Sequence, residues 1–280
     1  MLDFIKMQGT GNDFVLIDGR IQSERDWPEL ARAMCDRHFG VGADGILLVR
    51  ESTIADYRMV MYNPDGSEAE MCGNGIRCFA KYLYDTGDER YPELSVETGA
   101  GVKHVTVEAE GERAQRIVVD MGVPIFDPPA IPIAVGGTEV IDLPLRVDEQ
   151  SLSLTAVSMG NPHAIHFLDQ DVREFPLERI GPRVETDPLF PRRVNFEIAQ
   201  AMSTQHINVR VWERGAGITL ACGTGACAVF AAARRKGLIG ETATISLPGG
   251  NLEMRLGPRG QVLMAGPAAF VFQGEWPDAG

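Results

Sequence analysis

The sequence predicts a mixed α/β (α+β) protein made of two similar domains that arose by internal duplication. Short runs of β-branched and apolar residues, separated by Gly, Pro and Asp turns, dominate the chain. Only a few segments have helical periodicity, and a set of landmarks recurs about 150 residues further along the chain. The length of 280 residues is enough for two domains of ordinary size.

The expected elements follow from these patterns in chain order. Strands are predicted at residues 14–18, 46–49, 58–62, 102–108, 116–121, 155–159, 164–168, 207–212, 243–247 and 252–256. Helices are predicted at residues 27–37, 75–84 and 225–235, and each of the last two follows a Cys-Gly-x-Gly element.

The strongest evidence for duplication is a repeated motif. Cys-Gly-Asn-Gly, which begins at Cys72, recurs 150 residues later as Cys-Gly-Thr-Gly, which begins at Cys222. Three more landmarks recur in the same order: Tyr62-Asn63 as Trp212-Glu213, Gly11-Asn12 as Gly160-Asn161, and Leu94-Ser95-Val96 as Ile245-Ser246-Leu247. A period this long indicates two copies of a whole domain.

We therefore expect a first domain over residues 1–117 and a second over residues 118–265. The Pro-rich stretch 124–132 is expected to be the linker between them. The tail, residues 266–280, is expected to return a strand to the first domain.

Composition excludes several classes of function. The net charge of −13 argues against a nucleic-acid partner, because phosphate binding requires clustered Lys and Arg. The N-terminus lacks a signal-peptide pattern, and the longest small-apolar run, residues 218–233, is too short to span a membrane. We therefore expect no membrane partner. Five cysteines are an odd number, and no secretory signal is present, so we also expect no disulfide framework and a cytoplasmic location.

Cys72 and Cys222 each precede a predicted helix, which places both thiols at helix N-termini. Backbone N–H groups and the helix dipole favour negative charge there. The dipole contributes about 0.3–1 kcal/mol at an exposed site, which moves a thiol pKa by well under one unit. Direct N–H donors or a substrate ammonium must therefore help to hold a thiolate. The adjacent glycines would let a substrate carboxylate approach the backbone closely.

Two equivalent thiols suit inversion of a C–H centre, which needs a base on one face and an acid on the other. A zinc site is disfavoured, because no Cys-x-x-Cys occurs. Cys78 and Cys227 fit buried helix positions instead. A Cys72–Cys222 disulfide would form only on oxidation and would block function.

Polar residues in Gly- and Pro-bounded loops complete the candidate site. Most are related by the repeat, and the group comprises Asn12, Asn63, Asn161, Asn195, Glu213 and Arg214. His163 fits a core position as well as a site position. Two Gly-x-Gly-x-x-Gly/Ala strings, at residues 40–45 and 223–228, lack the strand–turn–helix context of a dinucleotide site.

At these residues the sequence closely resembles the diaminopimelate epimerases. The motifs that carry the resemblance span nearly the whole chain: MQGTGNDF (7–14), YNPDGS (62–67), MCGNGIRC (71–78), SMGNPH (158–163), VNFE (194–197), ERGAG (213–217) and ACGTG (221–225). Cys-Gly-x-Gly alone would admit the wider racemase superfamily.

The resemblance implies interconversion of LL- and meso-diaminopimelate in lysine and peptidoglycan biosynthesis, with no cofactor, neither pyridoxal phosphate nor metal. It implies two domains, each a barrel-like, mostly antiparallel sheet wrapped around a central helix, with the active site in the cleft between them. A small diamino dicarboxylic acid is the expected substrate, and a homodimer the expected assembly.

Carried over to this sequence, Cys72 and Cys222 correspond to the acid/base pair. The residues at the two helix starts that hold the reacting carboxylate correspond to Gly73, Asn74, Gly223 and Thr224. The remaining substrate-binding residues correspond to Asn12, Asn63, Asn161, Asn195, Glu213 and Arg214, with His163 and Asp44 as supporting polar groups.

Three positions depart from the family pattern: Gly45 where some members have glutamine, Thr10 where leucine is usual, and the local variant Phe196-Glu197-Ile198. Two other functions stay open: a related racemase of proline or histidine, and a non-catalytic binding protein for a dicarboxylic amino acid.

Overall fold

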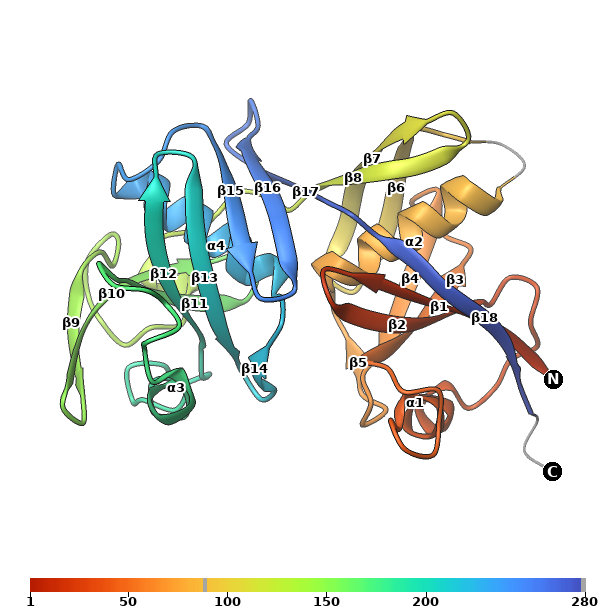
Figure 1. The fold of residues 1–280 in the computed structure, drawn as a ribbon, viewed down its shortest axis with the longest axis horizontal. Coiled ribbons are helices and arrows are strands. Elements are labelled where there is room, and N and C mark those ends of the chain that lie inside the picture. Colours follow the sequence, from red (N-terminus) through yellow and green to blue (C-terminus); the bar gives the residue numbers. More distant parts are fainter. Residues whose placement is uncertain (88–89, 278–280) are drawn as a thin grey trace. The chain divides into compact units, whose positions relative to one another are not determined.

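The computed structural model describes residues 1–87 and 90–277, which fold as two compact units (Figure 1). Unit 1 comprises Met1–Asp120 together with the chain from Ala265 onward, and unit 2 comprises Met121–Met264. Both are mixed α/β, and most of their regular structure is strand.

Unit 1 is a barrel-like sheet around one long helix. Its elements are β1 (Leu2–Gly9), β2 (Asn12–Asp18), α1 (Trp27–Cys35), β3 (Gly45–Arg50), β4 (Tyr57–Tyr62), β5 (Glu68–Ala69), α2 (Gly73–Thr86), β6 (Glu93–Thr98), β7 (Gly101–Glu110), β8 (Arg113–Asp120) and β18 (Ala269–Trp276). Pairing is antiparallel except for β2 with β3 and β4 with β6. The tail strand β18 pairs with β1, from Leu2 opposite Trp276 to Gln8 opposite Ala269.

Unit 2 repeats this plan. Its elements are η1 (Pro128–Ala130), β9 (Leu143–Val147), β10 (Gln150–Ser158), β11 (Pro162–Phe167), α3 (Leu177–Glu185), β12 (Asn195–Ser203), β13 (His206–Glu213), β14 (Gly217–Thr219), α4 (Gly223–Arg235), β15 (Thr242–Leu247) and β16 (Gly250–Leu256). The unit boundary falls inside β17 (Val262–Gly266). Again two pairs are parallel, β11 with β12 and β13 with β15.

The duplication therefore holds element by element. The parallel pair β2–β3 places Phe14 opposite Gly45, and β11–β12 places His163 opposite Asn195. Helices α1 and α3, at Trp27–Cys35 and Leu177–Glu185, are also offset by 150 residues. Positions in the two units can thus be matched by register.

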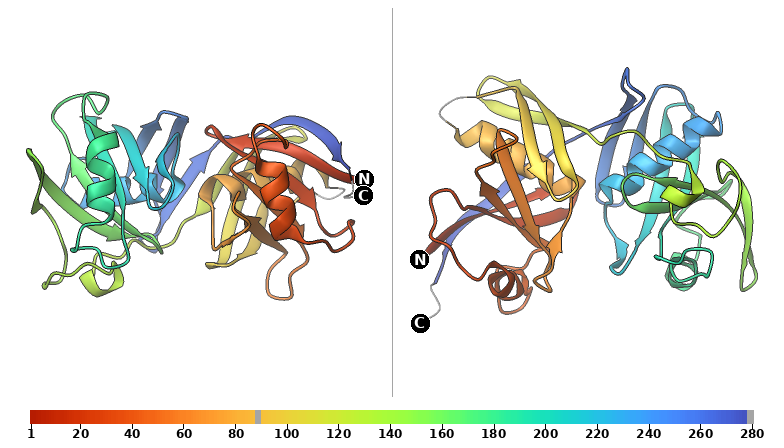
Figure 2. Two further views of the ribbon diagram at one scale, coloured as in Figure 1. Left: turned by 90° about the horizontal axis from the view of Figure 1, so that it is seen from below. Right: turned by 180° about the vertical axis from the view of Figure 1, so that it is seen from behind.

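The long helices α2 and α4 lie within the strands of their own units (Figures 1 and 2). In α4 almost every residue from Gly223 to Ala233 is buried, which is the pattern of a helix covered on all sides. A glycine- and alanine-rich sequence suits this place, because small side chains let strands approach the helix closely.

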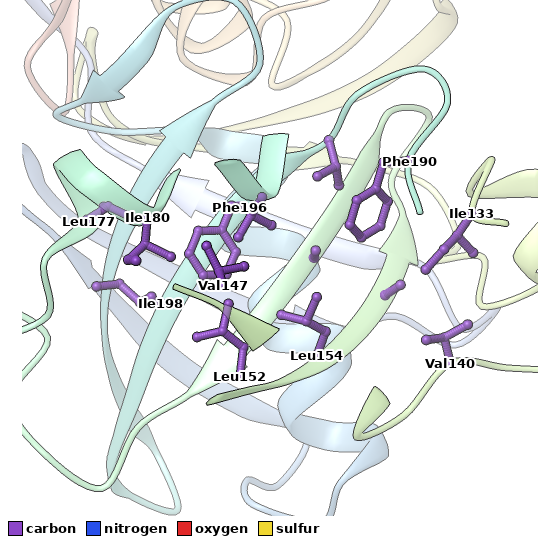
Figure 3. Close-up of a cluster of buried hydrophobic side chains, with 14 of the residues drawn as sticks. Ile133, Val140, Val147, Leu152, Leu154, Leu177, Ile180, Phe190, Phe196 and Ile198 are labelled. Atoms are coloured by element: carbon purple, nitrogen blue, oxygen red, sulfur yellow. The ribbon is translucent and has the colours of Figure 1, made fainter. Parts of the chain in front are cut away.

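A second core lies on the other face of each sheet. In unit 2, α3 packs Leu177 and Ile180 near Phe196 and Ile198 of β12 (Figure 3). In unit 1, α1 buries Trp27, Ala31 and Met34 in the corresponding way. Each sheet is therefore covered on both faces, which fixes the strand ends that carry the candidate site.

Residues 124–132, which were expected to form the linker, belong to unit 2. Ile125 pairs with Ser158 of β10, and Ile131 is fully buried in the second core of unit 2. Apolar side chains within the Pro-rich stretch bind it to that unit. The expected boundary after residue 117 likewise falls inside β8, which continues to Asp120.

Among the described residues, 1–87 and 90–277, no helix combines the length and apolar character needed to cross a bilayer.

Candidate active site

Cys72 and Cys222 are the N-caps of α2 and α4, and their local geometry is nearly the same. Both have extended backbones, with φ/ψ of −136°/116° at Cys72 and −121°/113° at Cys222. Each sulfur accepts a hydrogen bond of 3.3 Å from the N–H three residues on, at Gly75 and Gly225. The first-turn backbone N–H groups of each helix point out of its start, as in any α-helix, and this position beside the thiol favours negative charge.

Around Cys72, amide side chains hold the sulfur. The thiol donates to Asn12 Oδ1 at 3.6 Å, and Asn74 Nδ2 donates to the same oxygen at 3.2 Å. Asn12 is oriented in turn by Asp44, whose Oδ2 accepts from Asn12 Nδ2 at 2.5 Å. Asp44 thus fixes which end of the Asn12 amide faces the thiol.

The turn that presents Asn12 is strained. Thr10 and Gly11 form a two-residue hairpin loop with positive φ of 52° and 79°, and a β-branched residue rarely adopts this conformation. Thr10 is held by Arg77, a fully buried arginine of α2 that donates to Thr10 Oγ1 at 2.9 Å. Arg77 also donates to the carbonyl oxygen of Pro267 at 3.2 Å, which ties the returning tail to the start of α2.

A charged cluster supports Asn12 from the side away from Cys72. Asp13 pairs with Lys6 at 2.5 Å and with Arg37 at 2.8 Å, and Arg37 also pairs with Asp44 at 2.7 Å. Burial alone would raise the pKa of Asp13, but its bonds to Arg37 and Lys6 outweigh burial and hold that pKa below its usual value.

The surroundings of Cys222 form a longer chain of hydrogen bonds. Thr224 Oγ1 lies 3.5 Å from the sulfur, and Asn161 Nδ2 donates to that oxygen at 3.3 Å. Asn161 Oδ1 lies 2.9 Å from His163 Nε2, and His163 Nδ1 lies 2.7 Å from Glu197 Oε1. His163 and Glu197 are both fully buried.

Glu213 also contacts the Cys222 thiol. It hydrogen-bonds Thr219 and Cys222, and burial raises the pKa of its carboxyl. Burial, followed by the Glu213 and Glu197 carboxylates, raises the pKa of Cys222 well above its usual value. The bonds from Thr224 and Gly225 act in the opposite direction and do not compensate. Cys222 is therefore a thiol at neutral pH, despite its place at a helix N-terminus.

Three other predicted site residues are held outside these two networks. Asn195 donates to the carbonyl of Pro162 at 2.9 Å and accepts the Arg214 N–H at 2.9 Å. The Arg214 guanidinium donates to the carbonyl of Arg192 at 3.1 Å. Asn63 lies in the turn after β4 and donates to Ser67 Oγ at 3.0 Å.

Glu197 and Arg77 are not among the site residues predicted from the sequence. Glu197 lies between Phe196 and Ile198 in a buried strand, where a charged residue conflicts with its apolar neighbours. This conflict is the sequence feature that could have pointed to Glu197, since buried charged residues are usually paired or functional. Arg77 interrupts the buried face of α2 in the same way.

Cys78 and Cys227 are fully buried on α2 and α4, and burial raises the pKa of Cys78 to about 12. Among the residues that the structure describes, no three His, Cys, Asp or Glu side chains gather as metal ligands.

Comparison with known proteins identifies relatives over the whole chain. The sequence model of the diaminopimelate epimerase family matches residues 4–126 and 155–271. A diaminopimelate epimerase of Desulfitobacterium hafniense is 48% identical, and the match covers 98% of this chain and 97% of that one. The enzymes of the same name from Moorella thermoacetica and Methanococcus maripaludis are 47% and 44% identical, with coverage of 98–99% of this chain and 99% of theirs.

Solved structures with the same fold have diverged further in sequence. A probable proline racemase from Agrobacterium radiobacter superimposes with a TM-score of 0.74 at 14% identity, covering 100% of this chain and 94% of that one. A PhzF-family phenazine biosynthesis protein from Bacillus anthracis gives 0.70 at 20% identity, with 99% coverage of both chains. These two likenesses establish the fold: two mixed α/β units with barrel-like sheets.

Proposed function

Because the chain belongs to the diaminopimelate epimerase family, we propose that it interconverts LL- and meso-diaminopimelate by proton transfer between two cysteines. The chain is an isomerase of the epimerase class. One observation carries the mechanism: Cys72 and Cys222 cap matched helices of duplicated units with the same sulfur-to-N–H bond of 3.3 Å.

The proposed reaction needs one thiolate and one thiol, on opposite faces of one α-carbon. The thiolate takes the α-proton, and the C–H electron pair moves into the carbanion and onto the adjacent carboxylate. The opposite thiol then gives its proton to the other face, which forms the inverted C–H bond. The two sulfurs have exchanged protonation states, so the enzyme is ready for the reverse direction.

The helix starts supply the stabilisation that the carbanion needs. Charge gathers on the substrate carboxylate as the proton leaves, and preorganised N–H groups are most effective against charge that develops in the transition state. Gly73 and Asn74 at one helix start, with Gly223 and Thr224 at the other, place such groups beside each thiol. The absence of side chains at the glycines permits close approach.

The surroundings of Cys222 support different starting roles for the two sulfurs. Cys222 is held as a thiol by burial and two carboxylates, so it enters the first turnover as the acid. Cys72, which is half-buried and faces amides, is left to act as the base. A substrate ammonium would further favour the thiolate.

The distal end of the substrate carries a second amino-acid group, which is charged. Arg214 and the amides Asn63, Asn161 and Asn195 would bind it, because carboxylate and ammonium groups need both donors and acceptors. Lysine and peptidoglycan precursor synthesis would consume the product. We further propose a cytoplasmic homodimer. Five cysteines without a disulfide among the described residues fit a reducing compartment, and the exposed Val271 and Phe272 on β18 fit a contact surface.

The first test is isotopic. LL-diaminopimelate turned over in D₂O should give meso product that carries one α-deuterium, while LL-substrate recovered early should stay unlabelled. A single base would return label to both. Each of Cys72→Ala and Cys222→Ala should lower kcat by about 10²- to 10⁴-fold, and near wild-type turnover by either variant would exclude the two-base scheme.

The second test concerns the substrate. Chelator-treated enzyme should turn over LL-diaminopimelate in preference to proline, histidine and other amino acids with one centre. Preference for one of these would overturn the substrate assignment. A binding protein without catalysis would bind diaminopimelate but would exchange no α-deuterium.

A further inference from the structure

The buried His163–Glu197 pair of unit 2 is replaced by apolar residues at the matched places in unit 1. Register matches His163 to Phe14 and Glu197 to Leu47, because these residues hold the same places in the parallel pairs β11–β12 and β2–β3. Contacts with the helices agree. A methyl group at Gly225 would lie 2.7 Å from Glu197 Oε1, and one at Gly75 would lie 3.1 Å from Leu47 Cδ2.

The fold itself does not require a polar pair at this point. Phe14 and Leu47 fill the matched place in unit 1, and both are fully buried. A buried ion pair is generally no more stabilising than apolar side chains of similar volume. Moreover, Glu197 Oε2 is buried and is without a hydrogen-bond partner within residues 1–87 and 90–277. A carboxylate kept at such a cost calls for a role other than stability.

The bonds of the pair lead to the thiol. Glu197 Oε1 fixes His163 Nδ1 at 2.7 Å, and the ring then presents Nε2 to Asn161 Oδ1 at 2.9 Å. This contact orients the Asn161 amide so that its Nδ2 meets Thr224 Oγ1, which lies 3.5 Å from the Cys222 sulfur. All of these bonds lie within unit 2.

We propose that Glu197 is a positioning residue for Cys222, which acts by fixing the chain His163–Asn161–Thr224 that ends on the thiol. This inference rests on the proposed epimerase function, because it assigns Cys222 a place in proton transfer. The matched residues in unit 1 make Cys72 independent of such a pair, so the duplicated units have come to hold their two sulfurs differently.

The ionisable groups that act on Cys222 from neighbouring elements are Glu213 on β13 and Glu197 on β12. His163 on β11 contacts Glu197. The Glu197 carboxylate contributes to the raised pKa of Cys222. Loss of its charge should therefore make the thiol ionise at lower pH, while Glu213 and burial continue to act.

The experiment compares Glu197→Gln with wild type and with Glu241→Gln, a matched change at an exposed position of the same unit. Peptide mass spectrometry follows iodoacetamide alkylation of Cys222 and Cys72 against pH. In Glu197→Gln, the pH at which the alkylation rate of Cys222 is half-maximal should fall by about one unit or more. The corresponding pH for Cys72 should not change. The kcat for LL-diaminopimelate should fall by about tenfold to a hundredfold, with a smaller change in KM.

A purely structural role would lower thermal stability and expose both thiols at every pH, without moving one midpoint alone. Three outcomes would each overturn the proposal: this loss of stability with exposure of both thiols, an unchanged half-maximal pH for alkylation of Cys222, or wild-type kcat in the folded variant. If Glu197→Gln does not fold, the double variant His163→Phe/Glu197→Leu, which copies the residues of unit 1, decides by its kcat. A loss of tenfold or more supports the positioning chain, and wild-type kcat overturns it.

Alkylation does not depend on catalysis, which separates this proposal from the proposed function. An enzyme that leaves diaminopimelate unchanged, yet shows the selective shift at Cys222, would refute the substrate assignment and leave the coupling of Glu197 to Cys222 intact.

Discussion

Two glycines occupy the same position in the two helices, three residues after the capping cysteine, but face different neighbours. At Gly225 a methyl group would meet the Glu197 carboxylate at 2.7 Å and the Cys222 sulfur at 3.3 Å. At Gly75 it would meet Leu47 Cδ2 at 3.1 Å and the Cys72 sulfur at 3.6 Å. A leucine methyl can rotate away, whereas the carboxylate is fixed by a buried bond to His163.

We therefore expect Gly225→Ala to lower kcat by about tenfold to a hundredfold and Gly75→Ala to lower it less. Steady-state rates with LL-diaminopimelate, beside melting temperatures for both variants, measure the difference. Equal losses in the two variants would show that the Glu197 contact is unimportant.

The lowered pKa of Asp13 predicts how the stability of unit 1 depends on pH in acid. Its pKa in the folded state lies below the usual value because Arg37 and Lys6 outweigh the effect of burial. A carboxylate with a lowered folded pKa adds stability that is present above its unfolded pKa of about 3.9 and is lost as pH falls through the folded value. Wild type should therefore lose stability below about pH 4.

In Asp13→Asn part of this loss should already be present at pH 7, and the dependence on pH below 4 should be shallower. Circular dichroism melts from about pH 2 to about pH 7, a range that spans the unfolded pKa of Asp13, give the comparison. The result would contradict the account if wild type and variant had parallel profiles.

At the scale of elements, the strand pairs β2–β3 and β11–β12 offer a direct exchange. The double variant His163→Phe/Glu197→Leu replaces a buried, hydrogen-bonded polar pair by the apolar residues of the matched strands, and such replacements are neutral or stabilising by about 1–4 kcal/mol even for full ion pairs. We expect an unfolding midpoint in urea equal to or above that of wild type, together with reduced kcat. Glu197→Leu alone should instead destabilise by about 3–5 kcal/mol, because it leaves His163 buried without its partner.

The elements also show where sequence patterns suffice. The ten strands predicted from β-branched runs correspond to β2–β4, β7, β8, β10, β11, β13, β15 and β16, and α2 and α4 follow from Cys-Gly-x-Gly starts. Strands β1, β5, β6, β9, β12, β14 and β17 were not predicted. Helix α3 (Leu177–Glu185) was not predicted, because Gly181 and Pro182 lie inside it and weaken the local pattern. The repeat contained the missing information, since α3 lies 150 residues after the predicted α1.

For the whole molecule, duplication made the pairing of Cys72 with Cys222 predictable, but not their differences. Motifs give residue types at matched places, and the matched asparagines Asn12 and Asn161 were visible in sequence. Burial and partners come only from tertiary packing. No local pattern indicates that Glu197 meets His163, or that burial and two carboxylates raise the pKa of Cys222.

The proposed mechanism makes a last prediction for the chain as a whole. If both sulfurs act on one α-carbon, they must lie on either side of that carbon during turnover. A mild oxidant should then link Cys72 to Cys222. Cys72 is half-buried and the other four cysteines are buried, so the oxidant should attack Cys72 first. The sulfenic acid formed there would condense, with loss of water, with the thiol that shares its substrate in the proposed mechanism, Cys222.

We expect oxidation to abolish turnover, reductant to restore it, and bound substrate to slow the loss. Mass spectrometry of unreduced peptides should find the Cys72–Cys222 pair, and Cys72→Ser should be spared that link but be inactive. Loss of activity with both thiols still free would place the sensitive group elsewhere. Recovery of a linked yet active enzyme would show that the two sulfurs do not both serve the reaction, since a disulfide can neither take nor give the α-proton.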